Sequence, residues 1–435
     1  MAFLLTVVAA LSTAPLVAFH FNQFSWVGLF SNLIVVPWVG VVVVPLGLIC
    51  AITVIGSASS VFPLAGLVNG LVAVLMAIIE TFARLPWAEL HGPSPPIGVI
   101  ALWYAGGGIA FLSRASCLKR AGMALLCLIL TLPWILGIIR PERFLRLTFL
   151  DVGQGDAALI QFPKGQTMLV DGGGRYGDFD VGRLAVAPYL WDRSIRRVDY
   201  LVATHPQADH AGGLIYILRK FPVGEIWTNG VTKDALFFSD FIRVAGERGL
   251  PLKTINRQEP PLEIGGATVS ILHPDSVSSH VQDNNRSLVI RIQYGEYSSL
   301  FTGDIEAQAE RELLKRGPLL SSTVLKVPHH GSRTSIEPEF LVQVGPRMAI
   351  ISSGASNPYG HPAPETLAAY RFLGSQVYRT DREGAIVVTT DGQRLRVATY
   401  RDFRLTPVRW SYTMLTEEWE NWKKTARQWM RIDPA

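Results

Sequence analysis

The sequence predicts two unlike parts, an N-terminal α-helical transmembrane bundle followed by a C-terminal α/β domain in which helices cover two sheets. The bundle is indicated by an absence of charge, since no Asp, Glu, Lys or Arg stands between Met1 and Ile79. The α/β domain is indicated from Leu145 onward, where short β-rich runs alternate with helical patterns and are punctuated by glycines. The expected membrane region, α/β domain and amphipathic tail cover 1–140, 144–400 and 401–435.

The first part contains apolar runs that approach the ~20 residues a spanning helix needs. About five membrane segments are expected, at Phe3–Phe19, Val36–Ile55, Phe62–Phe82, Ile97–Leu112 and Ala121–Ile139. The first run lacks a basic leading region, so an opening helix is favoured over a signal peptide. The stretch Phe24–Val35 contains Asn32 and is followed by Pro37 and Pro45, which predicts a broken or re-entrant helix.

Charge and cysteine content limit the classes of function. The net charge of +5 permits an anionic partner without requiring one. All three cysteines, Cys50, Cys117 and Cys127, lie in the first part, which excludes a cysteine-ligated zinc site in the α/β domain. Basic residues flank both ends of the last apolar run, so the membrane orientation stays open.

The elements of the α/β domain are expected from alternation and from helical periodicity. The expected strands are Leu145–Leu150, Ala158–Phe162, Thr167–Val170, Tyr200–Ala203, Thr268–Leu272, Ser287–Tyr294, Ser298–Phe301, Val324–Val327, Met348–Ser352, Gln376–Arg379 and Ala385–Thr389. The expected helices are Ala211–Arg219, Ser239–Arg248 and Pro364–Leu373. For the tail helix Thr416–Met430, packing on its own domain is favoured over contact with a membrane surface or with DNA.

The strongest chemical signal is the loop Thr204–Gly213, which follows an expected strand and precedes an expected helix. His205, Asp209 and His210 stand within six residues of this loop, and they supply the nitrogen and oxygen ligands that suit Zn²⁺ or Mn²⁺. A single histidine here would be read as incidental, but this cluster predicts a metal site.

Two later strand ends carry residues of the same kind. Asp304 ends the run Phe301–Asp304, and its carboxylate is expected to complete or bridge a metal shell. His329 and His330 end the strand that begins at Val324. Because adjacent side chains point apart along a strand, at least one of these two histidines can face the metal.

Further polar residues are expected around the site rather than at its centre. We expect Asp171 to hydrogen-bond to the metal loop and Asp156 to orient a loop at the site mouth, although simple acidic turns would account for both. His361 suits either a ligand or a phosphate contact, with a helix-capping turn as the equal alternative.

The order of these motifs resembles the metallo-β-lactamase domain of the ComEC family, the inner-membrane channel of bacterial DNA uptake. The motifs that carry the resemblance are Asp151–Asp156, Val170–Gly174, Thr204–Gly213, Thr302–Asp304 and His329–Ser332, with Phe30–Pro37 in the apolar part. The resemblance covers nearly the whole chain. It implies a metallo-β-lactamase fold, an αββα sandwich, and a chain that corresponds to the C-terminal part of such a protein or to a truncated gene.

One departure from the superfamily pattern concerns the metals. Gln207 stands where the superfamily has His, and Asn285 falls about where it has another His. We therefore expect one dependable site for a divalent metal, Zn or Mn, and a weaker second site through His205. The dependable site is expected to use Asp209, His210, Asp304 and either His329 or His330.

The expected activity is hydrolysis of DNA phosphodiester bonds during internalisation in natural transformation. Asp209 or Asp304 would orient the attacking water, while Lys326 and Arg333 would hold phosphates beside the histidine pair, with Ser332 nearby. Gln207 and Asn285 leave open a transport protein with an inactive hydrolase domain. A membrane-tethered metallo-hydrolase of small phosphoesters is the other alternative.

The resemblance also implies a location and a set of partners. The expected location is the bacterial inner (cytoplasmic) membrane, crossed several times, with an extracytoplasmic position favoured for the hydrolase domain. The expected partners are single-stranded DNA in transit, membrane lipid and other DNA-uptake proteins, with homo-oligomerisation open.

Overall fold

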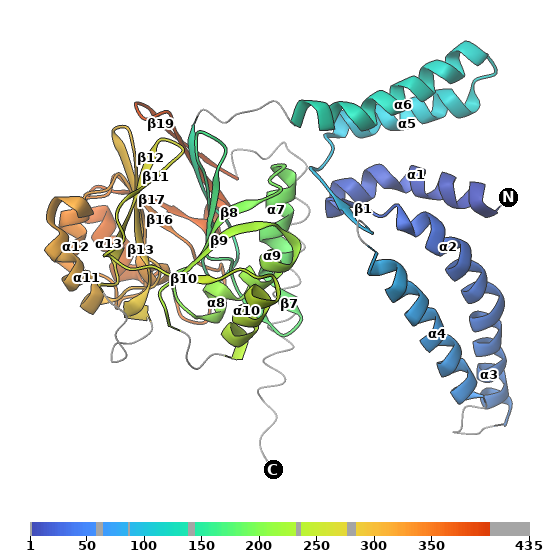
Figure 1. Ribbon diagram of the computed structural model, residues 1–435, viewed down its shortest axis with the longest axis horizontal. Helices are drawn as coiled ribbons and strands as arrows, with labels where there is room; N and C mark the ends of the chain where they lie inside the picture. The colour runs from blue at the N-terminus through green and yellow to red at the C-terminus, as the bar shows by residue number, and fades with distance from the viewer. Residues whose placement is uncertain are drawn as a thin grey trace. The chain divides into compact units, whose positions relative to one another are not determined.

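A computed structural model describes residues 2–57, 64–85, 88–137, 144–231, 236–275 and 284–400. The chain divides into two compact units, residues 1–138 and 139–435, each of which is described here by itself (Figure 1). The expected tail helix Thr416–Met430 lies outside the described residues.

The first unit is a set of apolar helices with one short antiparallel strand pair, β1 (Gln23–Phe24) with β2 (Leu90–His91). Its helices are α1 (Ala2–Phe21), α2 (Val27–Pro37), the π-helical segment η1 (Trp38–Val43), α3 (Val44–Ser57), α4 (Ala65–Ala83), α5 (Ile97–Leu112) and α6 (Ser116–Gly137). Within the described residues, Val27–Ile55 and Ala65–Ala83 are long and apolar enough to cross a membrane, and Thr6–Phe21 and Ile97–Leu112 are shorter apolar helices. By length and composition, these apolar helices are consistent with a helical membrane region.

The predicted break in the helix after Phe24–Val35 is wrong, because the helix does not stop at Pro37. The chain stays helical through Pro37, whose φ of −62° and ψ of −41° are helical, and continues as η1 and then α3. A proline removes one backbone donor from the helical ladder, and a π-helical turn is a local way to rearrange the remaining hydrogen bonds. The irregularity is therefore absorbed within one continuous helical rod.

Polar contacts join α5 to α1 inside this apolar unit. Trp103 Nε1 donates to Leu11 O at 3.1 Å, and the Tyr104 hydroxyl donates to Ser12 O at 2.7 Å. Such contacts satisfy polar atoms that lipid could not satisfy.

Among its described residues, the second unit contains two large sheets and a short antiparallel pair, β6 (Arg175–Tyr176) with β7 (Phe179–Asp180). The first has eight strands in the order β10-β9-β8-β5-β4-β3-β18-β19, and the second has seven in the order β11-β12-β13-β14-β15-β16-β17. The strands of the first sheet are β3 (Leu145–Phe149), β4 (Ala158–Gln161), β5 (Thr167–Val170), β8 (Val198–Ala203), β9 (Val223–Thr228), β10 (Leu252–Thr254), β18 (Ile386–Thr390) and β19 (Leu395–Thr399). Those of the second are β11 (Leu262–Ile264), β12 (Ala267–His273), β13 (Val289–Tyr294), β14 (Tyr297–Phe301), β15 (Val324–Lys326), β16 (Met348–Ile351) and β17 (Gln376–Arg379).

Three apolar layers hold this unit together. The middle layer packs the two sheets face to face through side chains such as Phe149, Trp227 and Phe301. The outer layers pack helices on the far face of each sheet, with Leu218 in one and Phe340 in the other. Figure 1 shows the two helical groups on opposite sides of the sheets: α7 (Ala187–Asp192), α9 (Leu214–Lys220) and α10 (Leu236–Glu247), and α11 (Ala307–Leu313), α12 (Pro338–Val344) and α13 (Pro364–Phe372). The prediction of an αββα sandwich is confirmed.

The topology gathers chemically active strand ends at one edge of the sandwich. Strands β5 and β8 are parallel neighbours in the first sheet, and β14 and β15 are parallel neighbours in the second. Because parallel strands end at the same edge, the segments that follow them lie together. Those segments carry Asp171, His205, Asp304 and His329.

Candidate metal centre

Four buried side chains converge at this edge: Asp156, His210, Asp304 and His330 each offer one ligand atom, and these atoms lie within 4.8 Å of one another. Nε2 of His210 lies 3.1 Å from Asp304 Oδ2, and Nε2 of His330 lies 3.2 Å from the same oxygen. Two imidazoles and two carboxylates of this kind form a compact ligand set for a divalent metal.

His210 is positioned by Asp171. It lies in the short helix α8 (Ala208–Ala211) directly after β8, and its Nδ1 donates to Asp171 Oδ2 at 2.8 Å. The same carboxylate accepts from Thr204 N at 2.9 Å and from the Thr204 hydroxyl at 2.8 Å. The expected hydrogen bond between Asp171 and the metal loop is present, and it leaves Nε2 of His210 as the atom that faces the cluster.

His330 is positioned by the backbone of a neighbouring strand end. His329 and His330 both adopt positive φ, 47° and 54°, so the chain turns sharply after β15. Nδ1 of His330 donates to Ser352 O at 3.1 Å, because a carbonyl can only accept. The ring therefore turns Nε2 toward Asp304, which itself is held by a backbone hydrogen bond to Ser287 Oγ at 3.1 Å.

Asp156 lies at the centre of the cluster, whereas the sequence predicts a place at the site mouth. Its amide donates to Asp209 O at 3.1 Å, which ties the loop after β3 to the metal loop. A Cβ on Gly155, whose φ is +134°, would come within 2.3 Å of that same carbonyl oxygen, so only glycine allows this approach. Oδ1 of Asp156 lies 3.3 Å from His330 Nδ1, and its side chain is 7% exposed.

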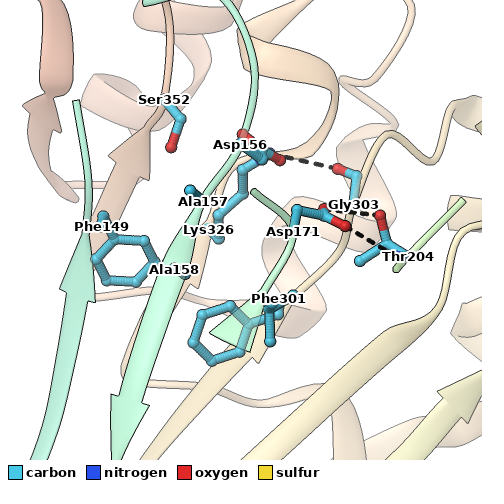
Figure 2. Close-up of a pocket in the computed structure, with 11 residues that line it drawn as sticks. Phe149, Asp156, Ala157, Ala158, Asp171, Thr204, Phe301, Gly303, Lys326 and Ser352 are labelled. Atoms are coloured by element: carbon cyan, nitrogen blue, oxygen red, sulfur yellow. Dashed lines mark hydrogen bonds and ion pairs between the residues drawn. The ribbon is translucent and has the colours of Figure 1, made fainter. Parts of the chain in front are cut away.

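Lys326 is the second departure from expectation. The sequence predicts a phosphate contact, but the side chain is only 5% exposed, and it points to Asp156, whose Oδ2 pairs with its ammonium (Figure 2). The ammonium also lies 3.9 Å from Asp304 Oδ1. Burial alone would raise the pKa of Asp156, and Lys326 together with His330 instead lowers it. The lysine therefore acts as an internal counter-charge for the cluster.

A cavity of about 10 Å³ lies behind the cluster, between the sheets. It is lined by Asp156, Asp171 and Lys326 on one side and by Phe149 and Phe301 on the other (Figure 2). This volume corresponds to about one water molecule, so it is not a substrate pocket.

Asp209 borders the cluster from the solvent side. Its side chain is 20% exposed, and its Oδ2 lies 3.4 Å from His330 Nε2. Burial would raise the pKa of Asp209, but His210 and His330 hold it below its usual range, so the carboxylate is ionised at neutral pH. It stands beside the four converging atoms.

The second metal site is expected at three positions, His205, Gln207 and Asn285, and the structure gives each of them different surroundings. His205 is buried, its ring centroid lies 4.2 Å from that of His210, and burial together with His210 lowers its pKa to about 4. Gln207 instead donates to Asn284 Oδ1, and Asn285 Oδ1 accepts from the amides of Glu306 and Ala309, around the start of α11. Asn285 is thus a helix-capping residue, and its amide oxygen does not face the cluster.

The paired histidines have separate surroundings. Nδ1 of His329 lies 3.2 Å from Glu306 Oε1, and its Nε2 lies 4.0 Å from Asp304 Oδ2, so His330 is the member that enters the cluster. Ser332 closes the following turn, where its hydroxyl lies 3.0 Å from that of Thr334. Arg333 is exposed next to Ser332.

His361 lies above the cluster rather than in it. Its ring centroid is 5.6 Å from that of His329 and 6.4 Å from that of His330. Burial, followed by the two neighbouring histidines, lowers the pKa of His361 to about 4. Its backbone amide donates to Asn357 Oδ1 at 2.9 Å, within a loop of which the sequence predicts only His361 as a site residue.

The hydrogen bonding of the central residues also fits a divalent metal. Among the described residues, no hydrogen-bond partner reaches Nε2 of His205, His210 or His330, or Oδ1 of Asp156 or Asp304. Buried polar atoms are normally satisfied, so a group of such atoms at one point is typical of a ligand shell.

Two family models match the chain. Residues 1–117 match the competence protein family, and residues 150–354 match the metallo-β-lactamase superfamily. The fold therefore indicates a metal-dependent hydrolase in general terms.

Curated relatives match most of the length of the chain. The chain is 26% identical to ComE operon protein 3 of Bacillus subtilis (strain 168), over 88% of this chain and 51% of that protein. It is 30% identical to competence protein ComA of Neisseria gonorrhoeae, over 89% of this chain and 52% of that protein. Among solved structures, a diphosphatase of the PhnP family is 15% identical with a TM-score of 0.34, over 57% of this chain and 98% of that one.

The chain thus spans about half the length of the curated relatives named above. It joins a region that matches the competence family to a region that matches the metallo-β-lactamase superfamily. The two family matches and these relatives together support assignment of the chain to the ComEC family of competence proteins.

Proposed function

We propose that the protein takes part in DNA internalisation during natural transformation, and that its globular domain hydrolyses phosphodiester bonds of incoming DNA. The observation that carries this proposal is the buried convergence of Asp156, His210, Asp304 and His330 in a chain of the competence family. A centre of this composition supports hydrolysis of a phosphoester.

The four converging residues would hold one divalent ion, Zn²⁺ or Mn²⁺. This set differs from the one expected from the sequence, because Asp156 enters it and Asp209 stands beside it. Since Gln207 and Asn285 bind other partners, His205 is the only one of the three positions expected to build the second site that still offers an unpaired buried atom. One ion per chain follows from this arrangement.

When bound, the metal would polarise a phosphoryl oxygen and make water more acidic. The chain's own contribution is to orient the attacking water. Asp209 is ionised and partly exposed beside the cluster, so its carboxylate can accept a hydrogen bond from the water that attacks phosphorus. Arg333, exposed near the same edge, can pair with a phosphate of the strand.

The test uses the full chain in detergent micelles with Mn²⁺ or Zn²⁺ and end-labelled single- and double-stranded DNA. We expect cleavage by the parent chain, and a loss of at least about 100-fold for Asp304→Asn, as for the removal of a group that acts on the reacting centre. Asp391→Asn, in the exposed turn between β18 and β19, is the matched control and should cleave normally. Metal binding with no cleavage by the parent chain under any condition would refute the nuclease proposal.

A second candidate is a transport protein with an inactive hydrolase domain. It is favoured by the hydrogen bonds of Gln207 and Asn285, which remove two expected ligands. A folded chain that contains no metal after incubation with Zn²⁺ or Mn²⁺ would support this candidate. A membrane-tethered hydrolase of small phosphoesters is the remaining alternative, and normal transformation in a deletion strain would favour it.

The location and partners are part of the same proposal. We place the chain in the bacterial inner membrane as a multi-pass protein, with the hydrolase domain on the extracytoplasmic side, where it meets incoming DNA. Single-stranded DNA, membrane lipid and other DNA-uptake proteins are the proposed partners. Self-association of the chain is tested with the same full chain in detergent micelles. An Asp391→Cys reporter in a cysteine-free chain, labelled with a membrane-impermeant reagent on intact cells, would decide the side.

A further inference from the structure

Tyr359 is a large, exposed aromatic side chain near the metal centre. It is 68% exposed, although the loop that carries it is well ordered by hydrogen bonds. Asn357 Oδ1 accepts from the amides of Tyr359, at 3.2 Å, and His361, at 2.9 Å. Its Nδ2 donates to His361 O at 2.6 Å and to Gly354 O at 2.8 Å. These bonds hold the backbone of the loop, so binding at Tyr359 requires little further ordering of the loop.

The ring of Tyr359 is connected to the metal centre by stacked rings. Its centroid lies 5.7 Å from that of His361 at an interplanar angle of 26°, and His361 lies 6.4 Å from His330 at 30°. Because His361 covers one face of the phenol and the side chain is mostly exposed, the opposite face is turned to solvent. An open aromatic face therefore lies two ring contacts from a residue of the metal cluster.

The surroundings of this face suit a polyanion that carries flat rings. Arg333 is exposed and close enough to His361 to contribute to lowering its pKa. Tyr176 lies on the same side, since Asp209 and Tyr359 add to the effect of burial in raising its pKa. Aromatic rings interleaved with a cation beside a hydrolytic centre are typical of single-stranded nucleic-acid binding.

We propose that Tyr359 stacks on a nucleobase of single-stranded DNA and thereby sets the strand's position relative to the metal cluster. This inference rests on the proposed function and names its substrate class. In duplex DNA, both faces of a base are covered by its neighbours, so only an unpaired strand can offer a face to the phenol. A small phosphoester has no base to stack, and an exposed ring would give it no affinity.

The experiment measures binding alone, so its result is independent of cleavage. The full chain in detergent is titrated with a fluorescent single-stranded oligonucleotide and with an abasic strand of the same length. We expect Tyr359→Ala to weaken binding of the normal strand about 5- to 100-fold, as for loss of one stacking contact. Tyr359→Phe keeps the ring and should bind as the parent does. Phe372→Ala removes another exposed ring, which is 92% exposed at the far end of α13, and should have no effect.

The outcomes separate this inference from the nuclease proposal. If Tyr359→Ala weakens the normal strand but not the abasic strand, the base contact is supported even when no cleavage is seen. If Tyr359→Ala binds as tightly as the parent chain, or if both strands lose affinity equally, base stacking is refuted. A Tyr359→Phe variant as weak as Tyr359→Ala would also refute it, because the hydroxyl and not the ring would then make the contact. Unchanged metal content in each variant shows that the cluster is intact.

Discussion

Oδ2 of Asp171 lies 2.8 Å from Nδ1 of His210, and the opposite nitrogen of the same ring lies 3.1 Å from Asp304. The carboxylate fixes the ring plane and its tautomer, so that Nε2 presents a lone pair to the metal centre. Asp171 also binds the backbone and the hydroxyl of Thr204, which makes it the joint between β5 and the metal loop.

We predict that Asp171→Asn weakens metal binding about 10- to 100-fold, the usual loss when a carboxylate behind a ligating histidine is altered. The dissociation constant of Mn²⁺ or Zn²⁺, measured by competition with a chelating dye, checks this. Asp391→Asn removes an exposed carboxylate elsewhere and serves as the control. Unaltered affinity in Asp171→Asn would show that His210 needs no such support.

The second prediction concerns metal stoichiometry. We expect one metal ion per chain by elemental analysis, a strong loss in Asp304→Ala, and no loss in Gln207→Ala, because Gln207 is occupied by Asn284. Two ions per chain, or a loss of one ion in Gln207→Ala, would contradict the single-site arrangement.

Lys326 leads to a prediction about stability. Lys326→Met leaves the carboxylate of Asp156 buried without its counter-charge, which should cost about 3–5 kcal/mol of unfolding free energy. Denaturant unfolding of the metal-free chain, followed by fluorescence, measures this loss. The double variant Lys326→Met with Asp156→Asn removes the unpaired charge and should regain most of the stability. A double variant no more stable than the single one would argue against charge compensation.

The burial of Glu310 leads to a prediction that stability depends on pH for a reason unrelated to the metal. Burial raises its pKa from 4.5 to about 8, and its Oε2 accepts from Glu337 N at 2.9 Å. The folded state therefore keeps a proton that the unfolded chain releases above about pH 4.5. Its contribution to stability is complete at low pH and is lost as the pH rises toward 8, by roughly 1.4 kcal/mol for each unit of raised pKa.

Glu310→Gln mimics the protonated form and should abolish this component. We expect the melting temperature of the parent chain to fall relative to Glu310→Gln between pH 5 and pH 8. If the melting temperatures of the two chains instead change in parallel between pH 5 and pH 8, the carboxyl of Glu310 titrates as in water.

The sequence predicts the fold class because its strongest signals are long-range averages. The uncharged stretch Met1–Ile79 and the repeated strands bounded by glycines remain recognisable even where single residues depart from the pattern. Strand β9 was missed because it contains Gly224 and Glu225, which are rare in strands; pairing with β8 and β10 makes it a strand. Helix α12 was missed because seven residues are too few to show a period.

The sequence could predict only those site residues that directly follow a recognisable strand. His210 and Asp304 follow strands, and the structure brings them together with His330. The place of Asp156 depends on a backbone contact with Asp209, and no spacing in the sequence expresses that contact. Lys326 looks like a surface cation in the sequence, because only the packing of two sheets decides that its ammonium lies inside.

The pairing of Lys326 with Asp156 also bears on how the protein matures. A small zinc module folds only when its ion binds, because the free energy of metal binding supplies its free energy of folding. Here the chain carries a cation of its own, and the carboxylate can be enclosed before any ion is captured. The ion pair thus provides a way for the sandwich to assemble without the metal.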